Sequence, residues 1–167
     1  MDDDNREEEE LPPWATWVHR ALRSIDKITA KMREERIKRN KEIVESLSDK
    51  YPEISRALKD LIPKRVTIET TKDGGIVVSR PADIYDMGYV IKFKCRERTC
   101  TVRGILETAG DYGSMKLFRE RMREYGCKIL SHEICVEEYC TASVRVRCSM
   151  SVDKLAEFID KVLKRYH

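Results

Sequence analysis

The sequence predicts an α+β protein: N-terminal helices and a hairpin, then a duplicated ββα unit that forms a four-stranded antiparallel sheet with helices on one face. Apolar residues recur at helical spacing up to about residue 62, strand-like alternation follows, and a C-x4-C turn occurs twice with similar flanking residues. We therefore divide the 167 residues into an acidic disordered tail, 1–12, a helical region, 13–63, and an α+β domain, 64–167.

The tail carries much of the charge asymmetry of the chain. Residues 1–10 have a net charge of −6, which leaves +9 on residues 11–167 within the total of +3. Such a tail is either a solvated segment that aids solubility or a mimic of a polyanion that screens the basic body. It does not resemble a secretory signal, and no run approaches the roughly 18 apolar residues of a membrane span, so we expect a cytoplasmic protein without membrane contact.

A long helix is expected from about Pro13 into the forties. Its apolar residues alternate at spacings of four and three and form a heptad-like stripe, Trp14, Val18, Ala21, Ile25, Ile28 and Met32. This stripe needs a partner, either the body of the protein or another copy of the chain, so a homodimer through this helix is one expectation. The helix becomes basic over 31–41, which is either a solvated face or a binding surface that includes Arg36 and Arg39.

The remaining elements are shorter. A second helix ends at Pro63, and 66–78 form a hairpin around Asp73, Gly74 and Gly75. Residues 88–126 and 127–167 then read as two copies of strand, C-x4-C turn, strand and helix, with equivalent cysteines 40 residues apart.

The six cysteines support the register of this repeat. If Cys135 faces Cys140 across the second hairpin, opposed residues have numbers that sum to 275. Cys127 and Cys148 satisfy the same condition, and opposed Cα atoms are within disulfide range. A zinc site built from the two C-x4-C turns, or free buried thiols, are the alternatives. We predict three disulfides: Cys95 with Cys100, Cys135 with Cys140, and Cys127 with Cys148.

The composition is that of a heat-adapted protein. Charged residues make up 38% of the chain, Gln is absent, and Asn5 and Asn40 are the only Asn residues. Dense charge with few thermolabile amides is typical of hyperthermophile proteins. Because intracellular disulfides are common in hyperthermophilic archaea, a cytoplasmic location and disulfide bonds are compatible.

Alternation along the strands sorts the repeat into two faces. One face collects core residues such as Ile91, Val102 and Val144, and the other collects cations with apolar residues between them. That arrangement suits a protein that binds single-stranded nucleic acid, because cations contact phosphates and apolar side chains contact bases. The alternative is a solvated face or one covered by the N-terminal helices. The predicted nucleic-acid-binding residues are Lys92, Lys94, Arg103, Arg145, Arg147, Arg36, Arg39, Tyr89, Ile105 and His132.

Catalytic patterns are missing from the sequence. His19, His132 and His167 have no metal-ligand spacing, and there is no phosphate-cradling Gly-rich loop, nucleophile elbow or Walker motif. We therefore expect no enzymatic activity, no metal and no cofactor.

With its acidic tail, helical N-terminal half, ββαββα half, basic sheet face and hyperthermophile composition, the chain resembles the ThermoDBP family of archaeal single-stranded DNA-binding proteins and their relatives. The resemblance lies in the layout of most of the chain. It implies a cleft between helices and sheet, with an apolar floor and basic rims, that grips single strands with little sequence preference. ThermoDBP proteins dimerise through a C-terminal zipper, whereas this chain ends at His167 after its last helix, so a dimer would use the N-terminal helix.

The sequence thus predicts non-catalytic, largely sequence-independent binding of single-stranded DNA or RNA, with DNA favoured, in a hyperthermophilic archaeon. The alternative is an oligomerising structural or regulatory module that uses the N-terminal helix and has no role in nucleic-acid binding.

Overall fold

The structure, a computed structural model, describes residues 13–82 and 88–164, and the predicted acidic tail lies outside the described residues. Its elements confirm the α+β class. The helices are α2 (Pro13–Ser46), α3 (Pro52–Lys59), α4 (Tyr112–Glu124) and α5 (Val152–Phe158), which continues as the π-helical turn η1 (Ile159–Leu163). The strands are β1 (Thr67–Thr70), β2 (Ile76–Arg80), β3 (Gly88–Arg96), β4 (Thr99–Asp111), β5 (Cys127–Val136) and β6 (Tyr139–Ser151).

The chain divides into two compact units, residues 1–38 and residues 39–167. Helix α2 supplies the described part of the first unit, and its last turns belong to the second. None of the described helices combines the length and the apolar character needed to cross a membrane.

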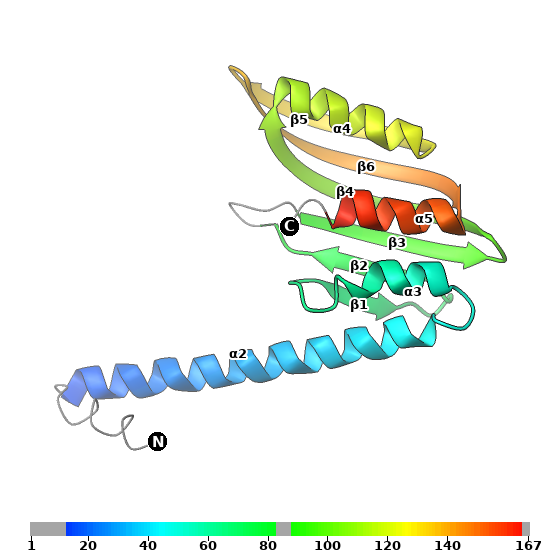
Figure 1. Ribbon diagram of the computed structural model, residues 1–167. Helices are drawn as coiled ribbons and strands as arrows, with labels where there is room; N and C mark the ends of the chain where they lie inside the picture. Colours follow the sequence, from blue (N-terminus) through cyan, green and yellow to red (C-terminus); the bar gives the residue numbers. More distant parts are fainter. Residues whose placement is uncertain (1–12, 83–87, 165–167) are drawn as a thin grey trace. The chain divides into compact units, whose positions relative to one another are not determined.

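The second unit is built on one antiparallel sheet with the strand order β1-β2-β3-β4-β6-β5 (Figure 1). This sheet has six strands, so the predicted four-stranded arrangement is not confirmed. The hairpin of β1 and β2 joins it through β2, where Val77 lies opposite Lys92 and Val78 opposite Ile91. This pairing occupies backbone groups of β3 that would otherwise form an exposed sheet edge.

Strands β4 and β6 form the centre of the sheet and pair with each other over their whole length. The register runs from Thr99 opposite Ser151 to Asp111 opposite Tyr139. Both strands curve strongly in Figure 1. Gly104 allows β3 to approach β4 closely, because a Cβ atom at this position would collide with the carbonyl oxygen of Val90.

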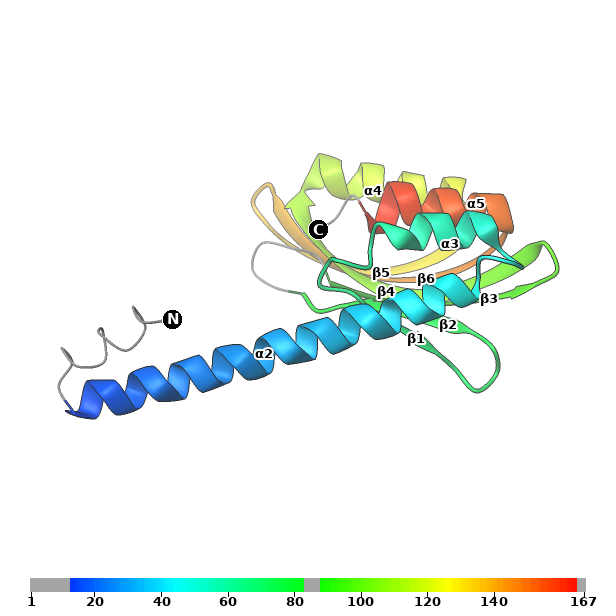
Figure 2. The same ribbon diagram turned by 60° about the horizontal axis from the view of Figure 1, so that its bottom comes forward.

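Helices α3, α4 and α5 lie on one face of the sheet (Figure 1 and Figure 2). Helix α4 contacts β4, β5 and β6, helix α5 contacts β4 and β6, and α3 packs against α5. Leu106 of β4, Met122 of α4 and Phe158 of α5 are completely or almost completely buried in the core of this unit. We call the sheet face that points away from these three helices the open face.

Three disulfides join neighbouring strands as predicted. Cys95 pairs with Cys100 between β3 and β4, and the Cys127–Cys148 and Cys135–Cys140 pairs both join β5 to β6. Their Cα–Cα distances are 4.0 to 4.1 Å, slightly below the roughly 4.5 Å typical of directly opposed residues in a non-hydrogen-bonded pair. Each of the six cysteines belongs to one of these three pairs.

The elements after Gly88 recur at a spacing of 40 residues. Strands β4 and β6 begin 40 residues apart, and so do helices α4 and α5. The turns that precede β4 and β6 share an unusual backbone position, since Glu97 and Glu137 have φ angles of 56° and 58°. A disulfide flanks each turn. A duplication as the origin of this spacing stays a prediction.

Each of these turns also accepts a hydrogen bond from the first residue of a helix: the β5–β6 turn from α4, and the β3–β4 turn from α5. The N–H of Tyr112 donates to the carbonyl of Glu138, and the N–H of Val152 donates to the carbonyl of Arg98, both at 3.1 Å. These hydrogen bonds therefore connect residues 88–126 with residues 127–164 at both ends of the β4–β6 pair.

Asn40 attaches the end of α2 to the edge of the sheet within the second unit. Its side chain is 1% exposed. The amide donates to Val66 O at 2.8 Å and accepts from Ile68 N at 2.9 Å. These two bonds satisfy backbone groups at and just before the outer edge of β1, which is the terminal strand of the sheet among the described residues.

The disulfides should differ in their contribution to stability. Replacing both Cys127 and Cys148 with Ala is expected to lower the free energy of unfolding by about 3 kcal/mol. The same change at Cys95 and Cys100 should cost about 2 kcal/mol, because these residues are 5 apart in sequence and the first pair is 21 apart. Guanidinium denaturation without reductant measures both values. A larger loss for the shorter loop would contradict this account.

Candidate nucleic-acid interface

Strand alternation places most of the predicted binding residues together on the open face. Strand β6 alternates between exposed and buried residues along its whole length, and β4 does the same over most of its length. The exposed or half-exposed positions of these strands and of β3 and β5 include seven of the ten predicted residues: Lys92, Lys94, Arg103, Ile105, His132, Arg145 and Arg147.

The prediction that Tyr89 contributes to the open face is wrong. It is 3% exposed and shares the helix-covered side of β3 with the buried residues Ile91 and Phe93. Burial raises the pKa of Tyr89 to about 12, although the charge of Arg80 acts in the opposite direction. The two-residue period of a strand assigns Tyr89 to the core, so its ring is not available on the open face.

Arg36 and Arg39 lie on α2. Arg36 is half-buried and Arg39 is exposed. Their contribution to a binding groove, and the cleft between helices and sheet that the resemblance implies, stay predictions.

Four cations form a row across four neighbouring strands. The register places Lys92 opposite Arg103, Arg103 opposite Arg147, and Arg147 opposite Lys128. With about 4.8 Å between strands, this row is about 14 Å long. We call Lys92, Arg103, Arg147 and Lys128 the cation row. Like charges opposite each other destabilise a sheet, so the fold maintains this arrangement at an energetic cost.

The cation row is neutralised at one end. Lys92 Nζ lies 2.9 Å from Asp73 Oδ2. Hydrogen bonds from the Thr71 hydroxyl and from Lys92 hold the pKa of Asp73 well below its usual range. Within residues 18–82 and 88–164, no carboxylate forms an ion pair with the other three members of the row. Unneutralised neighbouring cations create a positive potential that attracts an anionic ligand.

A second row lies two residues further along each strand, about 7 Å away. It places Val90 opposite Ile105, Ile105 opposite Arg145, and Arg145 opposite Leu130. The three apolar side chains are exposed by 55%, 39% and 69% in the order Val90, Ile105, Leu130. We call these four residues the apolar row. Exposed aliphatic side chains beside cations offer a surface for the faces of bases.

The cation row and three members of the apolar row line adjoining depressions of the open face. The first has a volume of about 560 Å³ and the second about 650 Å³. Lys94, Lys92 and Asp73 belong to the first, whereas Ile105, Leu130 and Arg145 belong to the second. Both include Arg103, Arg147 and Lys128, which therefore separate a polar hollow from a more apolar one.

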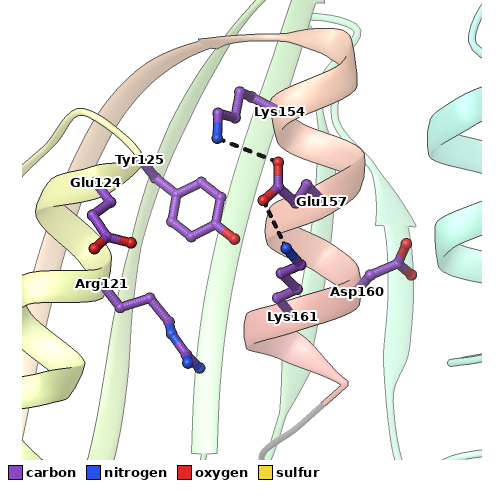
Figure 3. A pocket seen from close by; sticks show the side chains of 7 residues that line it. All are labelled: Arg121, Glu124, Tyr125, Lys154, Glu157, Asp160 and Lys161. Atoms are coloured by element: carbon purple, nitrogen blue, oxygen red, sulfur yellow. Dashed lines mark hydrogen bonds and ion pairs between the residues drawn. The ribbon is translucent and has the colours of Figure 1, made fainter.

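A pocket on the helix side of the sheet, about 420 Å³ in volume, has a different electrostatic character (Figure 3). Its cations are neutralised locally, because Glu157 accepts hydrogen bonds from Lys161 at 3.0 Å and from Lys154 at 3.3 Å. These bonds lower the pKa of Glu157. Burial raises the pKa of Tyr125, which lines the same pocket. Its mixed charges do not favour a polyanion.

Sequence reasoning missed Lys128 and Leu130, which lie on the open face of β5. The relation that pairs Cys127 with Cys148 also pairs Lys128 with Arg147 and Leu130 with Arg145. Opposed residues of β5 and β6 have numbers that sum to 275 throughout the hairpin. Applied to every residue of β5, this relation predicts the positions of Lys128 and Leu130 on the open face.

In the part of the chain that the structure describes, no three His, Cys, Asp or Glu side chains gather as a metal site requires. Comparison of the chain with protein-family models, curated proteins and solved structures found no match.

Repulsion within the cation row predicts that Arg147→Gln stabilises the protein. Arg147 lies between Arg103 and Lys128, so its neutralisation should raise the free energy of unfolding by about 0.5 kcal/mol at low salt. The gain should disappear near 1 M salt, where the screening length falls to about 3 Å. Urea denaturation at both salt concentrations measures it.

Arg123→Gln is the matched control for this measurement. Arg123 is exposed in the last turn of α4, where the helix dipole favours a cation. This variant should show no gain in stability. Equal effects of the two substitutions would show that repulsion within the cation row is negligible.

Proposed function

We propose that this protein binds single-stranded nucleic acid on the open face, without catalysis and with little sequence preference. The cation row carries this proposal: four positive side chains on four adjacent strands, beside a parallel row of exposed aliphatic side chains. Phosphates contact the cations, and bases lie on Val90, Ile105 and Leu130. DNA is the favoured ligand because of the resemblance in layout to the ThermoDBP family.

The character of the open face supports a binding mode dominated by charge. Arg103, Arg145 and Arg147 contact phosphates and can also stack on bases through their planar guanidinium groups. Aromatic side chains are scarce on this face, where Tyr139 at the end of β6 is 58% exposed. Because stacking is limited, the affinity should depend steeply on salt.

A carboxylate, a serine and a histidine lie side by side on the open face, but not in the order that a catalytic triad requires. The register places Ser143 between Glu107 and His132. A nucleophilic serine needs a histidine that lies between it and the carboxylate, so that the carboxylate can orient the imidazole. Here the serine occupies the middle position. The three residues therefore do not match the order of a Ser–His–carboxylate triad.

The first test of the proposal is fluorescence anisotropy with labelled single-stranded DNA, single-stranded RNA and duplex DNA. We expect tighter binding of single strands, with a log–log salt slope of about −3 if four phosphates are neutralised at about −0.7 each. The double variant Arg145→Glu/Arg147→Glu should weaken binding at least tenfold, because it reverses two charges at the centre of the face.

The control for this variant is Lys116→Glu/Arg123→Glu, which changes the net charge equally. Both residues are exposed on α4, on the other side of the sheet. It should weaken binding far less, since its charges lie away from the proposed site. No binding by the unaltered protein at low salt would overturn the proposal.

Helix α2 supports a second candidate function, an oligomerising module. Five apolar side chains along this helix are 41% to 63% exposed: Val18, Leu22, Ile25, Ile28 and Met32. Most of them belong to the heptad-like stripe of the sequence, and such a stripe is stabilised when a second helix covers it. In this candidate the cation row has no role.

Substitution in the stripe tests the second candidate. If α2 pairs with α2 of another copy, Ile25→Lys/Ile28→Lys should convert an oligomer into a monomer, since charges would be buried in the helix seam. Sedimentation equilibrium across a concentration series measures the change. Lys27→Glu/Lys31→Glu, on exposed positions of the same helix, is the control. A wild-type chain that stays monomeric at high concentration would contradict this candidate.

A further inference from the structure

We propose that a bound single strand crosses the β-strands at a steep angle, along the cation row from β3 to β5, and that Lys128 and Leu130 of β5 are binding residues. This inference rests on the proposed function and names the path of the ligand within that site. It assigns a role to a strand from which the sequence suggested only His132 as a binding residue.

The distribution of charge distinguishes a path across the strands from a path along them. On the open face of β4, Arg103 is the only cation, and Glu107 lies four residues further along. On β6, Arg145 and Arg147 are neighbours, and the positions on either side of them are Ser143 and Ser149. A ligand that followed β4 or β6 would meet at most two cations, and one that followed β3 would meet three, Lys92, Lys94 and Arg96. One that crosses the strands along the cation row meets four.

The recurrence of elements at a spacing of 40 residues allows each member of the cation row to be compared with the residue at the equivalent position of the other copy. The positions 40 residues after Lys92 and Arg103 are occupied by His132 and Ser143. The position 40 residues before Arg147 is Glu107, and that before Lys128 is Gly88. Equivalent backbone positions thus exist twice, but only one set is basic. The geometry therefore provides one track for phosphates on each chain and not two.

The two ends of the cation row differ in their electrostatic surroundings. At β3 the ion pair between Lys92 and Asp73 places a carboxylate beside the row, and this negative charge disfavours a further phosphate. At β5 the row ends on the last strand of the sheet, with Lys128 exposed and no ion pair to it among the described residues. The track is about 14 Å long, which corresponds to about four or five nucleotides at the 3.4 Å spacing of a stacked strand.

Lys128 and Leu130 provide the test, because a path that follows β3, β4 or β6 does not require them. We expect Lys128→Glu to weaken binding of a labelled dT12 oligonucleotide about tenfold at 50 mM salt. Leu130→Ser should weaken it about threefold, with a smaller change in the salt slope than Lys128→Glu causes, since it removes apolar ground and no charge. Neither change is expected to unfold the protein, because both side chains are exposed, and circular dichroism checks this.

Two variants on α4 are matched controls. Lys116→Glu makes the same charge change, and Leu117, 66% exposed, matches Leu130 at 69%. Lys116→Glu and Leu117→Ser should bind nearly as the unaltered protein does.

The outcomes separate this inference from the proposed function. If the unaltered protein binds dT12 and both β5 variants bind as their controls do, the path across the sheet is wrong while the proposed function stands. If the unaltered protein does not bind, the proposed function itself fails. Weakening by the β5 variants alone supports both.

Discussion

The pairing of β4 with β6 is the constraint on which the rest of the second unit depends. These strands are not neighbours in sequence, and no disulfide joins them, yet they pair from Thr99 opposite Ser151 to Asp111 opposite Tyr139. A slip of one residue would turn either strand over and exchange its buried and exposed sets. Val102 and Val144 would then face solvent, which is a large loss of apolar burial. The core of the helix-covered face thereby determines where Arg103 and Arg147 lie on the other face.

Charge is treated differently on the two sides of this sheet. On the helix side, cations lie beside carboxylates: Arg119 is 2.6 Å from Glu133, and Lys164 is 2.9 Å from Asp60. On the open face, three members of the cation row have no such neighbour among the described residues. The fold thus accepts repulsion between strands at a place where pairing with Glu or Asp would have removed it. That cost is understandable if the face binds an anionic ligand, and it is the physical basis of the proposed function.

Much of this arrangement was predictable from particular residues. The cysteine register identified all three disulfides and assigned Ile91, Val102 and Val146 to the core, as the structure confirms. Tyr89 was misplaced because a tyrosine near a strand end was expected at the edge of the open face, although its odd-numbered neighbours are buried. Lys128 and Leu130 lie on the open face because the register that opposes Cys127 and Cys148 also opposes Lys128 to Arg147 and Leu130 to Arg145.

The sequence by itself determined which residues share a face of each strand and which residues are opposed within each hairpin, because alternation and tight turns act over a few neighbouring residues. Only the tertiary structure decided that β2 joins β3 to make six strands and that β4 lies beside β6. Those pairings join segments separated by loops or by a whole helix, and they depend on how the helices cover one face. Lys92, Arg103, Arg147 and Lys128 therefore become a row only when the sheet is assembled.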